Sequence, residues 1–344
     1  MFCCANCFGD GHLRDEVIPR LSSAKGVCSY CESEEQDLVA PALLREYFEL
    51  LASIYLQQED GRFLVEWLKD DWALFSHARM DVAHAKELLA DILDDGDIVR
   101  KSFLPSERSI SDALEKWEAL RAELMHSNRY FPKTEINHDR LRRLFGFLLL
   151  KEIDLPQRWF RARIQSSELV FRPDEMGAPP KQLASHGRAN PAGIPYLYLA
   201  STALTAISEI RPHTGETASV AEFSILRSLK IADLRHPKKT ISPFILDDED
   251  EIALLRGDVR FLEKLGEELT RPVIPRSAAF DYIPSQYLCE FAKSCGFDGV
   301  MYRSSVGDGV NVALFDPTHA QVIEITRNAV LRVAIDFARL ADAS

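Results

Sequence analysis

The spacing of apolar residues changes near the middle of the chain, and this change constrains the fold more than any other feature. Over residues 37–150 apolar side chains recur at steps of three and four, which is typical of amphipathic helices. After Glu152 prolines enter, and short apolar runs alternate with turns, which is typical of strands. The sequence therefore predicts an α+β chain, with a helical bundle at 36–151 and a strand-based domain at 152–344.

Within these halves the pattern predicts individual elements. We expect helices at 43–55 and 85–93, one that begins at Ser109, and one at 138–150. The expected strands are 159–164, 196–200, 217–225, 230–234, 299–303, 310–315 and 321–326, and the expected helices among them are 201–210, 252–269 and 285–295. Ser201 and Ser285 are the expected caps of their helices. Because regular helices do not separate the strands, we expect a mixed β-sandwich with short helices.

Four cysteines at the start of the chain have the spacing of a zinc site. Cys4 and Cys7 are separated by two residues, and so are Cys28 and Cys31. Such pairs let one turn direct two sulfurs at an ion, and two pairs complete a tetrahedral shell. We therefore predict a structural Cys4 zinc knuckle over residues 1–35, in which Cys3 can replace Cys4, with disulfides and redox thiols as the alternatives.

The later cysteines and the net charge do not predict a second metal site or a nucleic-acid surface. Cys289 and Cys295 have no metal-binding neighbours and are expected to be small buried residues. A net charge of −12 disfavours a general nucleic-acid surface.

The longest apolar run, 144–150, is far shorter than the ~20 residues of a membrane span, and no secretory signal is recognisable, so we expect a cytoplasmic protein. The acidic run 247–251 is expected to be the solvated start of helix 252–269.

Two Arg-x4-His spacings in the first half suggest an alternative function. They are Arg79 with His84 and Arg121 with His126, and they resemble the ribonuclease motif of HEPN helical domains. The motif usually has a polar residue after the arginine, whereas this chain has Met80 and Ala122. An RNA-binding or RNA-cleaving protein that acts through the zinc and helical region is therefore the alternative interpretation.

Several polar residues of the second half are difficult to explain by a purely structural role. Arg161 and Arg163 alternate along one expected strand, so both guanidinium groups face the same side. Arg188 lies in the turn 187–193, which begins and ends with glycine. Glu209 ends helix 201–210, where a carboxylate opposes the helix macrodipole, so another interaction should favour it. Tyr198 shares a face with Tyr196, which we interpret as a core residue, and we interpret Arg163 as an ion-pair partner.

Taken in order, five segments resemble the RES domain, which is named for its Arg, Glu and Ser. They are Trp-Phe-Arg161, Gly-Arg188-Ala-Asn-Pro, Leu-Tyr198-Leu-Ala, Ser-Glu209 and Tyr-Arg-Ser304-Ser, within residues 158–326. The resemblance implies a fold similar to that of ADP-ribosyltransferases and cleavage of the nicotinamide–ribose bond of NAD⁺. It also implies a toxin or defence effector whose partner is an antitoxin or another regulatory protein. The zinc and helical region is similar to the HEPN-related extension of some RES proteins.

The resemblance assigns roles to residues of this chain. Arg161, Glu209 and Ser304 become the catalytic candidates, and Arg188, Tyr198, Ser305 and Asn311 the candidates for contact with NAD⁺. Arginine forks suit phosphate oxygens, and a tyrosine can stack on a ring of the dinucleotide. A carboxylate stabilises the oxocarbenium character that the ribose gains as nicotinamide leaves. Small family members carry tryptophan where this chain has Ala189, which changes one wall of the site.

Some alternatives remain open in the sequence. The acceptor of the ADP-ribosyl group is water, phosphate or a protein side chain. Besides an NAD⁺-consuming enzyme and an RNA-binding or RNA-cleaving protein, a third possible function is an NAD⁺ sensor without turnover. Ser304 and Ser305 are adjacent, so either can be the functional serine. A homo-oligomer is compatible with the sequence.

Overall fold

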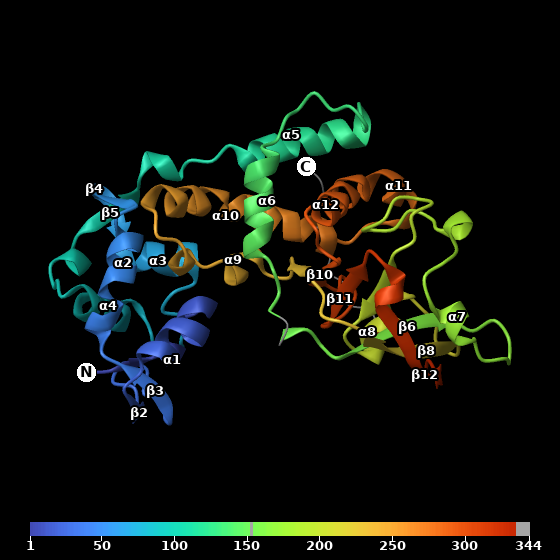
Figure 1. Cartoon of the computed structure of the whole chain (residues 1–344), viewed down its shortest axis with the longest axis horizontal. Helices are drawn as coiled ribbons and strands as arrows, with labels where there is room; N and C mark the ends of the chain where they lie inside the picture. Colours follow the sequence, from blue (N-terminus) through green and yellow to red (C-terminus); the bar gives the residue numbers. More distant parts are fainter. Residues whose placement is uncertain (152–153, 335–344) are drawn as a thin grey trace, which may run out of the picture. The chain divides into compact units, whose positions relative to one another are not determined.

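The chain forms two compact units. The structure, a computed structural model, describes residues 1–151 and 154–334 (Figure 1). Unit 1 is Met1–Leu148 with His236–Glu267, and unit 2 is Leu149–Arg235 with Glu268–Ser344. The domain boundary expected at Glu152 lies outside the described residues. The second segment of unit 1, 236–267, comes from the half of the sequence that we expected to form a separate domain.

Unit 1 is mainly helical. Its helices are α1 (Ile18–Leu21), α2 (Arg45–Ala52), α3 (Leu64–Trp72), α4 (Val82–Leu93), α5 (Ala113–His126), α6 (His138–Phe147), α9 (Pro237–Thr240) and most of α10 (Glu249–Thr270). Helix α6 ends three residues before the predicted end at Leu150, and Leu149 forms a β-bridge with Ala232 in unit 2. No helix in the described ranges is long and apolar enough to cross a membrane.

Two small sheets correct the prediction of a purely helical first half. Strands β1 (Cys3–Cys4), β3 (Gln36–Val39) and β2 (Ala24–Gly26) form one, in that order, and β4 (Tyr55–Phe63) pairs with β5 (Ser102–Pro105) in the other. The sequence of β4 is mostly polar and lacks the alternation of apolar and polar residues that predicts a strand. A Cβ at Gly61 would lie 2.3 Å from the Phe103 carbonyl oxygen, so the absence of a side chain permits this pairing.

Ion pairs hold α10 within unit 1. Arg256 donates from Nε to Asp71 Oδ2 of α3 at 2.6 Å, and Tyr55 donates its hydroxyl to the same oxygen at 2.9 Å. Arg140 of α6 donates to Asp258 at 2.8 Å. Segment 236–267 is thus joined to unit 1 by partly buried charges.

The acidic start of α10 is paired rather than only solvated. Arg108 donates to Glu249 and Asp250, and Arg140 and Arg143 donate to Glu251. The expectation of a free solvated run was therefore incomplete.

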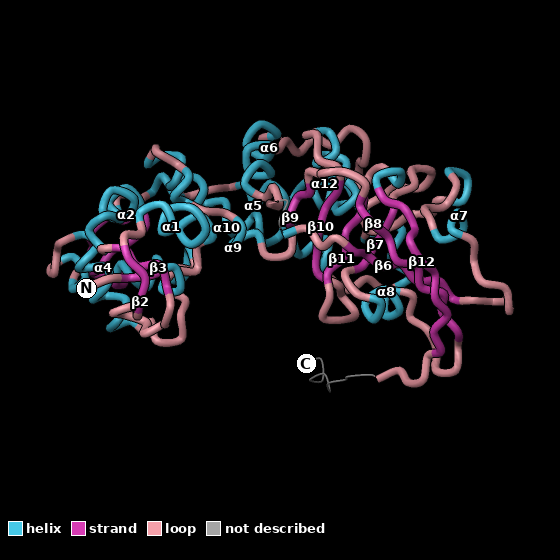
Figure 2. The backbone as a smooth tube through the Cα atoms, turned by 60° about the horizontal axis from the view of Figure 1, so that its bottom comes forward, coloured by secondary structure: helices cyan, strands magenta, loops and turns pink. Residues whose placement is uncertain are grey.

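Unit 2 contains a mixed seven-stranded sheet (Figure 2). Its strands are β6 (Arg158–Ile164), β7 (Leu197–Ala200), β8 (Thr217–Ile225), β9 (Ile231–Asp233), β10 (Gly299–Arg303), β11 (Val310–Leu314) and β12 (Ala320–Ala329). The order is β12-β8-β6-β7-β11-β10-β9, and only β9 and β10 are parallel. The seven predicted strands are confirmed, with small shifts at their ends. The β-sandwich and the likeness to ADP-ribosyltransferases stay predictions.

The helices of unit 2 differ from expectation at their caps. They are α7 (Pro173–Met176), α8 (Ala203–Glu209), α11 (Ala278–Asp281) and α12 (Ile283–Ser294). Thr202, not Ser201, caps α8, because its Oγ1 accepts from the backbone N–H of Thr205. Ser285 lies inside α12 and is fully buried, so the predicted cap was wrong there too.

The two faces of the sheet carry side chains of different size. One face has a core of large residues that includes Trp159 and Leu199. On the other face Ala162 and Ala200, which alternate with them along the strands, pack with Ala206 of α8. Small side chains let α8 lie close to the sheet, and Glu209 is the last residue of that helix.

Replacing Asp71 by alanine tests how firmly α10 is held. Arg256 and Tyr55 would lose a partly buried partner, so we expect the free energy of unfolding to fall by about 2–4 kcal/mol. Urea unfolding followed by tryptophan fluorescence measures the change. The matched control is Asp70→Ala, which removes an exposed ion pair with Arg62 and should cost less than about 1 kcal/mol. Equal losses in the two variants would contradict the anchoring role of Asp71.

Candidate functional site

Unit 2 contains a cavity of about 520 Å³. Strands β6, β7, β10 and β11, helix α8 and the segments 187–188 and 273–282 contribute to its walls. Its lining is Phe160, Arg161, Ala162, Gly187, Arg188, Tyr198, Leu199, Ala200, Ala206, Glu209, Ile210, Arg211, Val273, Ala278, Tyr282, Tyr302, Ser305 and Asn311. The volume is in the range of small-molecule sites.

The cavity lies where β6 and β7 part. These strands share a single residue pair, Phe160 with Ala200. Three consecutive residues of each strand line the cavity, 160–162 and 198–200, although neighbours in a strand point to opposite faces. Both strands therefore border the cavity beside the single pair that joins them.

The side chain of Arg161 bridges the two strands beside this pair. Its Nη1 donates to the backbone carbonyl of Tyr198 at 3.1 Å, which gives that carbonyl a partner on the side where the strands part. Burial, and then the neighbouring charge of Arg163, lower the pKa of Arg161 to about 10, so it is still charged at neutral pH. No carboxylate of the described residues pairs with it, and its Nε is buried without a hydrogen-bond partner. A buried cation without a counterion favours an anionic ligand.

The carboxylate of Glu209 accepts hydrogen bonds from two side chains that are distant in the sequence. Ser304 Oγ donates to Glu209 Oε1 at 2.7 Å, and Asn311 Nδ2 donates to the same oxygen at 2.5 Å. These donors supply the interaction that a carboxylate at a helix C-terminus needs. Asn311 is buried, whereas Glu209 is exposed, so the carboxylate is fixed yet reachable.

The two adjacent serines have different surroundings. Ser304 follows β10 and is the residue bonded to Glu209, and its Oγ also accepts from the backbone N–H of Val306. Ser305 lines the cavity, and no hydrogen bond of its hydroxyl is seen among the described residues. The geometry thus distinguishes two residues that the sequence left equivalent.

Tyr198 holds the turn that carries Arg188. Its hydroxyl donates to Asn190 Oδ1 at 2.7 Å and accepts from the backbone N–H groups of Ala189 and Asn190. Burial raises the pKa of this hydroxyl, which keeps it protonated as a donor. A Cβ at Gly187 would lie 2.6 Å from the hydroxyl oxygen, so only glycine fits there.

The contacts in the structure limit the role of Tyr198, agree with the core role expected for Tyr196, and differ from the role expected for Arg163. The hydroxyl of Tyr198 is committed to the turn, and only its ring remains for a ligand. Tyr196 is buried and packs on Phe315, as expected for a core residue. Arg163 donates to the carbonyl of Gly177, and the predicted ion pair is not formed with any described carboxylate.

Sequence reasoning did not assign three polar residues of the lining to the site. Tyr282 lies beneath the guanidinium of Arg188, 5.4 Å from it to the ring centre. Arg211, two residues after Glu209, is exposed and has a left-handed backbone with φ of 48°. Tyr302 is buried in the wall. The position of Arg211 beside Glu209 was a usable signal, whereas nothing in the local sequence marks Tyr282.

The lining of the cavity carries more positive than negative charge. Arg161, Arg188 and Arg211 contribute positive charge, and Glu209 contributes the single carboxylate of the lining. Arginine forks can bind phosphate oxygens, and a fixed carboxylate can stabilise developing positive charge.

Comparison with known proteins identifies the family. The family model of the RES domain matches residues 158–336, which is more than half of the chain. The chain belongs to the RES domain family. No curated protein matches its sequence. A chain in the crystal structure of the M. tuberculosis MbcT–MbcA toxin–antitoxin complex is similar, with a TM-score of 0.32 and 14% identity, over 55% of this chain and 92% of that chain.

The RES match begins at the first residue of β6, so the cysteine cluster lies outside it. Cys4, Cys7, Cys28 and Cys31 are buried, and their sulfurs all lie within 4.8 Å of one another. Sγ of Cys4 is 3.5 Å from Cys31, and Sγ of Cys7 is 3.4 Å from Cys28. Four sulfurs around a tetrahedral zinc would be about 3.8 Å apart, so the four side chains fit the ion. A closed thiolate shell of this kind supplies stability and leaves no position for catalysis.

Cys3 is not part of this cluster. Its sulfur points to the carbonyl of Val39 at 3.6 Å, because neighbouring residues of β1 face opposite ways. The predicted exchange of Cys3 for Cys4 is therefore not supported by the geometry.

The cysteine cluster predicts a metal content that can be measured. We expect about one zinc per chain in freshly purified protein, and its loss in Cys28→Ser, because three thiolates hold the ion far less tightly. Mass spectrometry of the metal content gives the ratio. Cys3→Ser is the matched control and should keep the metal. Loss of zinc from the control, or its absence from the wild type, would refute the assignment.

Proposed function

We propose that the chain is an NAD⁺-consuming enzyme that cleaves the bond between nicotinamide and ribose. The observation that carries the proposal is a buried, uncompensated Arg161 in the same cavity as a carboxylate, Glu209, fixed by Ser304 and Asn311. NAD⁺ combines the two features that such a cavity suits, a pyrophosphate and a glycosidic bond to a cationic leaving group. Membership of the RES domain family supports the same substrate.

The arginines and rings have the task of binding. Arg161 and Arg188 hold the pyrophosphate oxygens by charge-assisted hydrogen bonds. The ring of Tyr198 forms part of the wall on which an aromatic group of the dinucleotide packs. Ser305 lies beside the ligand as a further hydrogen-bonding group.

Glu209 has the task of stabilising the transition state. As the glycosidic bond breaks, its electron pair leaves with nicotinamide, which becomes neutral, and positive charge develops on the ribose. A carboxylate fixed beside the ribose stabilises that charge more than it stabilises the ground state. Ser304 and Asn311 keep the carboxylate oriented, so little reorganisation is needed when the charge appears.

In the second half of the reaction an acceptor forms a bond to the ribose. Water, inorganic phosphate or a protein side chain attacks the anomeric carbon and gives ADP-ribose, an ADP-ribose phosphate or an ADP-ribosylated protein; an attacking water or side-chain hydroxyl also loses a proton. We include in the proposal a role as a toxin or defence effector that an antitoxin restrains, in keeping with the family. Mass analysis of the product with and without phosphate identifies the acceptor.

Replacing Glu209 by glutamine tests the central role. The amide keeps the size and hydrogen-bonding capacity of the side chain but not its charge, so we expect nicotinamide release to fall at least about 100-fold. Release from NAD⁺ is measured chromatographically with the full chain. Glu324→Gln removes an exposed carboxylate from β12 and should keep wild-type activity. Similar rates for Glu209→Gln and the wild type would exclude the proposed role.

The two serines provide a finer test. Ser304→Ala removes one of the two donors to Glu209, and we expect kcat to fall roughly tenfold. Ser305→Ala leaves the carboxylate bonded, so kcat should stay within about twofold of wild type. Circular dichroism of both variants checks the fold. A larger effect at Ser305 would reverse the assignment of the functional serine.

A further inference from the structure

Arg188 owes its position to contacts far away in the sequence. Its backbone carbonyl accepts from Ser285 Oγ of α12 at 2.6 Å, and the carbonyl of Gly187 accepts from Gln286 Nε2 at 2.8 Å. Both donors are buried. Helix α12 therefore fixes the backbone of the turn together with Tyr198.

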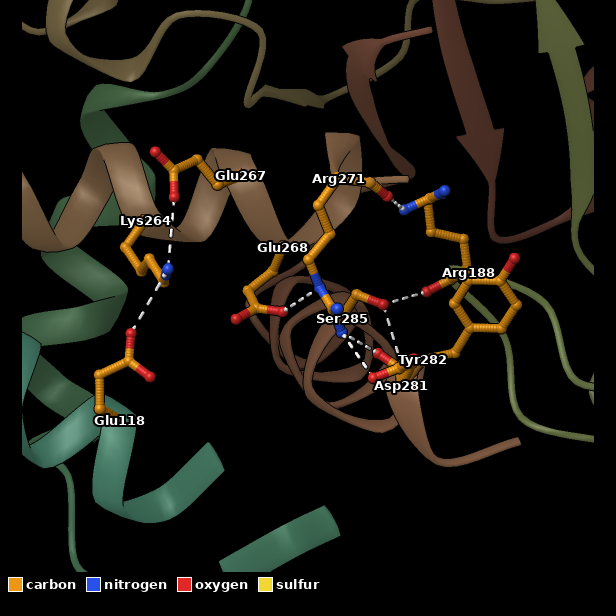
Figure 3. Close-up of polar contacts among 9 residues, drawn as sticks. All are labelled: Glu118, Arg188, Lys264, Glu267, Glu268, Arg271, Asp281, Tyr282 and Ser285. Atoms are coloured by element: carbon orange, nitrogen blue, oxygen red, sulfur yellow. Dashed lines mark hydrogen bonds and ion pairs between the residues drawn. The ribbon is translucent and has the colours of Figure 1, made fainter. Parts of the chain in front are cut away.

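The guanidinium of Arg188 is held separately. Its Nη1 donates to the backbone carbonyl of Arg271 at 2.8 Å, and the group lies over the ring of Tyr282 (Figure 3). Arg271 directly follows Thr270, the last residue of α10. The final carbonyls of a helix lack partners within it, and a cation there interacts favourably with the macrodipole. Arg188 thus caps the C-terminus of α10.

The side chain of Arg271 fixes the carbonyl that Arg188 uses. Its Nε donates to Glu268 Oε2 at 3.2 Å, and its Nη2 donates to the backbone carbonyl of Asp281 at 2.6 Å. The carboxylate of Asp281 lies 3.5 Å from the same Nη2. The Glu268 side chain is only 1% exposed, and a carboxylate so buried is costly without a paired cation. Arg271 therefore ties the end of α10 to α11, immediately before Tyr282.

We propose that Arg271 is a positioning residue for the cavity, which acts by holding Arg188 where it can bind the anionic part of the ligand. One N–H of Arg188 is committed to Arg271, and a guanidinium has four more to offer to phosphate oxygens. Without the side chain of Arg271, the carbonyl and the ring of Tyr282 no longer fix Arg188, and ordering it becomes a cost of binding. The choice of pyrophosphate as the anion rests on the proposed function.

A first experiment measures Arg188 without any ligand. Phenylglyoxal modifies accessible arginines, and peptide mass spectrometry gives the rate at each position. In Arg271→Met we expect Arg188 to react several-fold faster than in the wild type, because its guanidinium is released. Arg276→Met, which removes an exposed arginine from the same segment, is the matched control and should leave the rate unchanged. An unchanged rate in Arg271→Met, with the fold intact by circular dichroism, would overturn the proposal.

A second experiment uses ADP-ribose, a ligand that has no glycosidic bond to nicotinamide. Calorimetry of the full chain gives its Kd in the wild type, Arg271→Met, Arg188→Met and the double variant. We expect a roughly tenfold weaker Kd in Arg271→Met, and less than about a twofold further change when Arg188 is already methionine. Additive effects would show that Arg271 acts independently of Arg188 and would overturn the proposal. If the wild type binds no ADP-ribose, the proposed function fails, whereas the modification rates still decide the role of Arg271.

Discussion

The parting of β6 and β7 is the constraint on which the site depends. Because the two strands share only the pair Phe160 and Ala200, the carbonyl of Tyr198 has no backbone partner from β6, and Arg161 takes that place with its side chain. A single guanidinium therefore adds a hydrogen bond between the two strands and places a positive charge in the lining of the cavity. The remaining features of the cavity follow from the strands and the helix that border this gap.

Helix α8 carries the carboxylate of the cavity lining, whose charge is opposite to that of Arg161. Alanines at 162 and 200 let α8 approach, and the length of that helix places Glu209 at its C-terminal end, where the macrodipole disfavours a carboxylate. Ser304, which follows β10, and Asn311 of β11 compensate by donating hydrogen bonds to this carboxylate. Two hydrogen bonds thereby fix the orientation of this carboxylate.

The RES match and the compact units divide the chain differently. Residues 236–267 lie inside the match, yet their contacts, such as Arg256 with Asp71, are made in unit 1. The helix that starts there ends at Thr270, and the next carbonyl receives Arg188 of the cavity. A chain cut after the first 150 residues would therefore separate unit 1 from part of its own packing, so the full chain is the proper object of functional study.

The sequence by itself determined the elements that local periodicity encodes, namely the seven strands of unit 2, most helices and the two cysteine pairs, and the order of its motifs indicated Arg161, Arg188, Tyr198, Glu209 and Ser304. It missed β4 and β5, which depend on each other for pairing rather than on an alternating pattern. Only the tertiary structure decided which serine meets Glu209, what the hydroxyl of Tyr198 does, and that Arg271 and Tyr282 hold Arg188. The physical reason is distance along the chain: Asn311 and Glu209 are 102 residues apart, and Ser285 and Arg188 are 97 apart. Partners so remote leave no periodic trace in the sequence, because the fold alone brings them within hydrogen-bond distance.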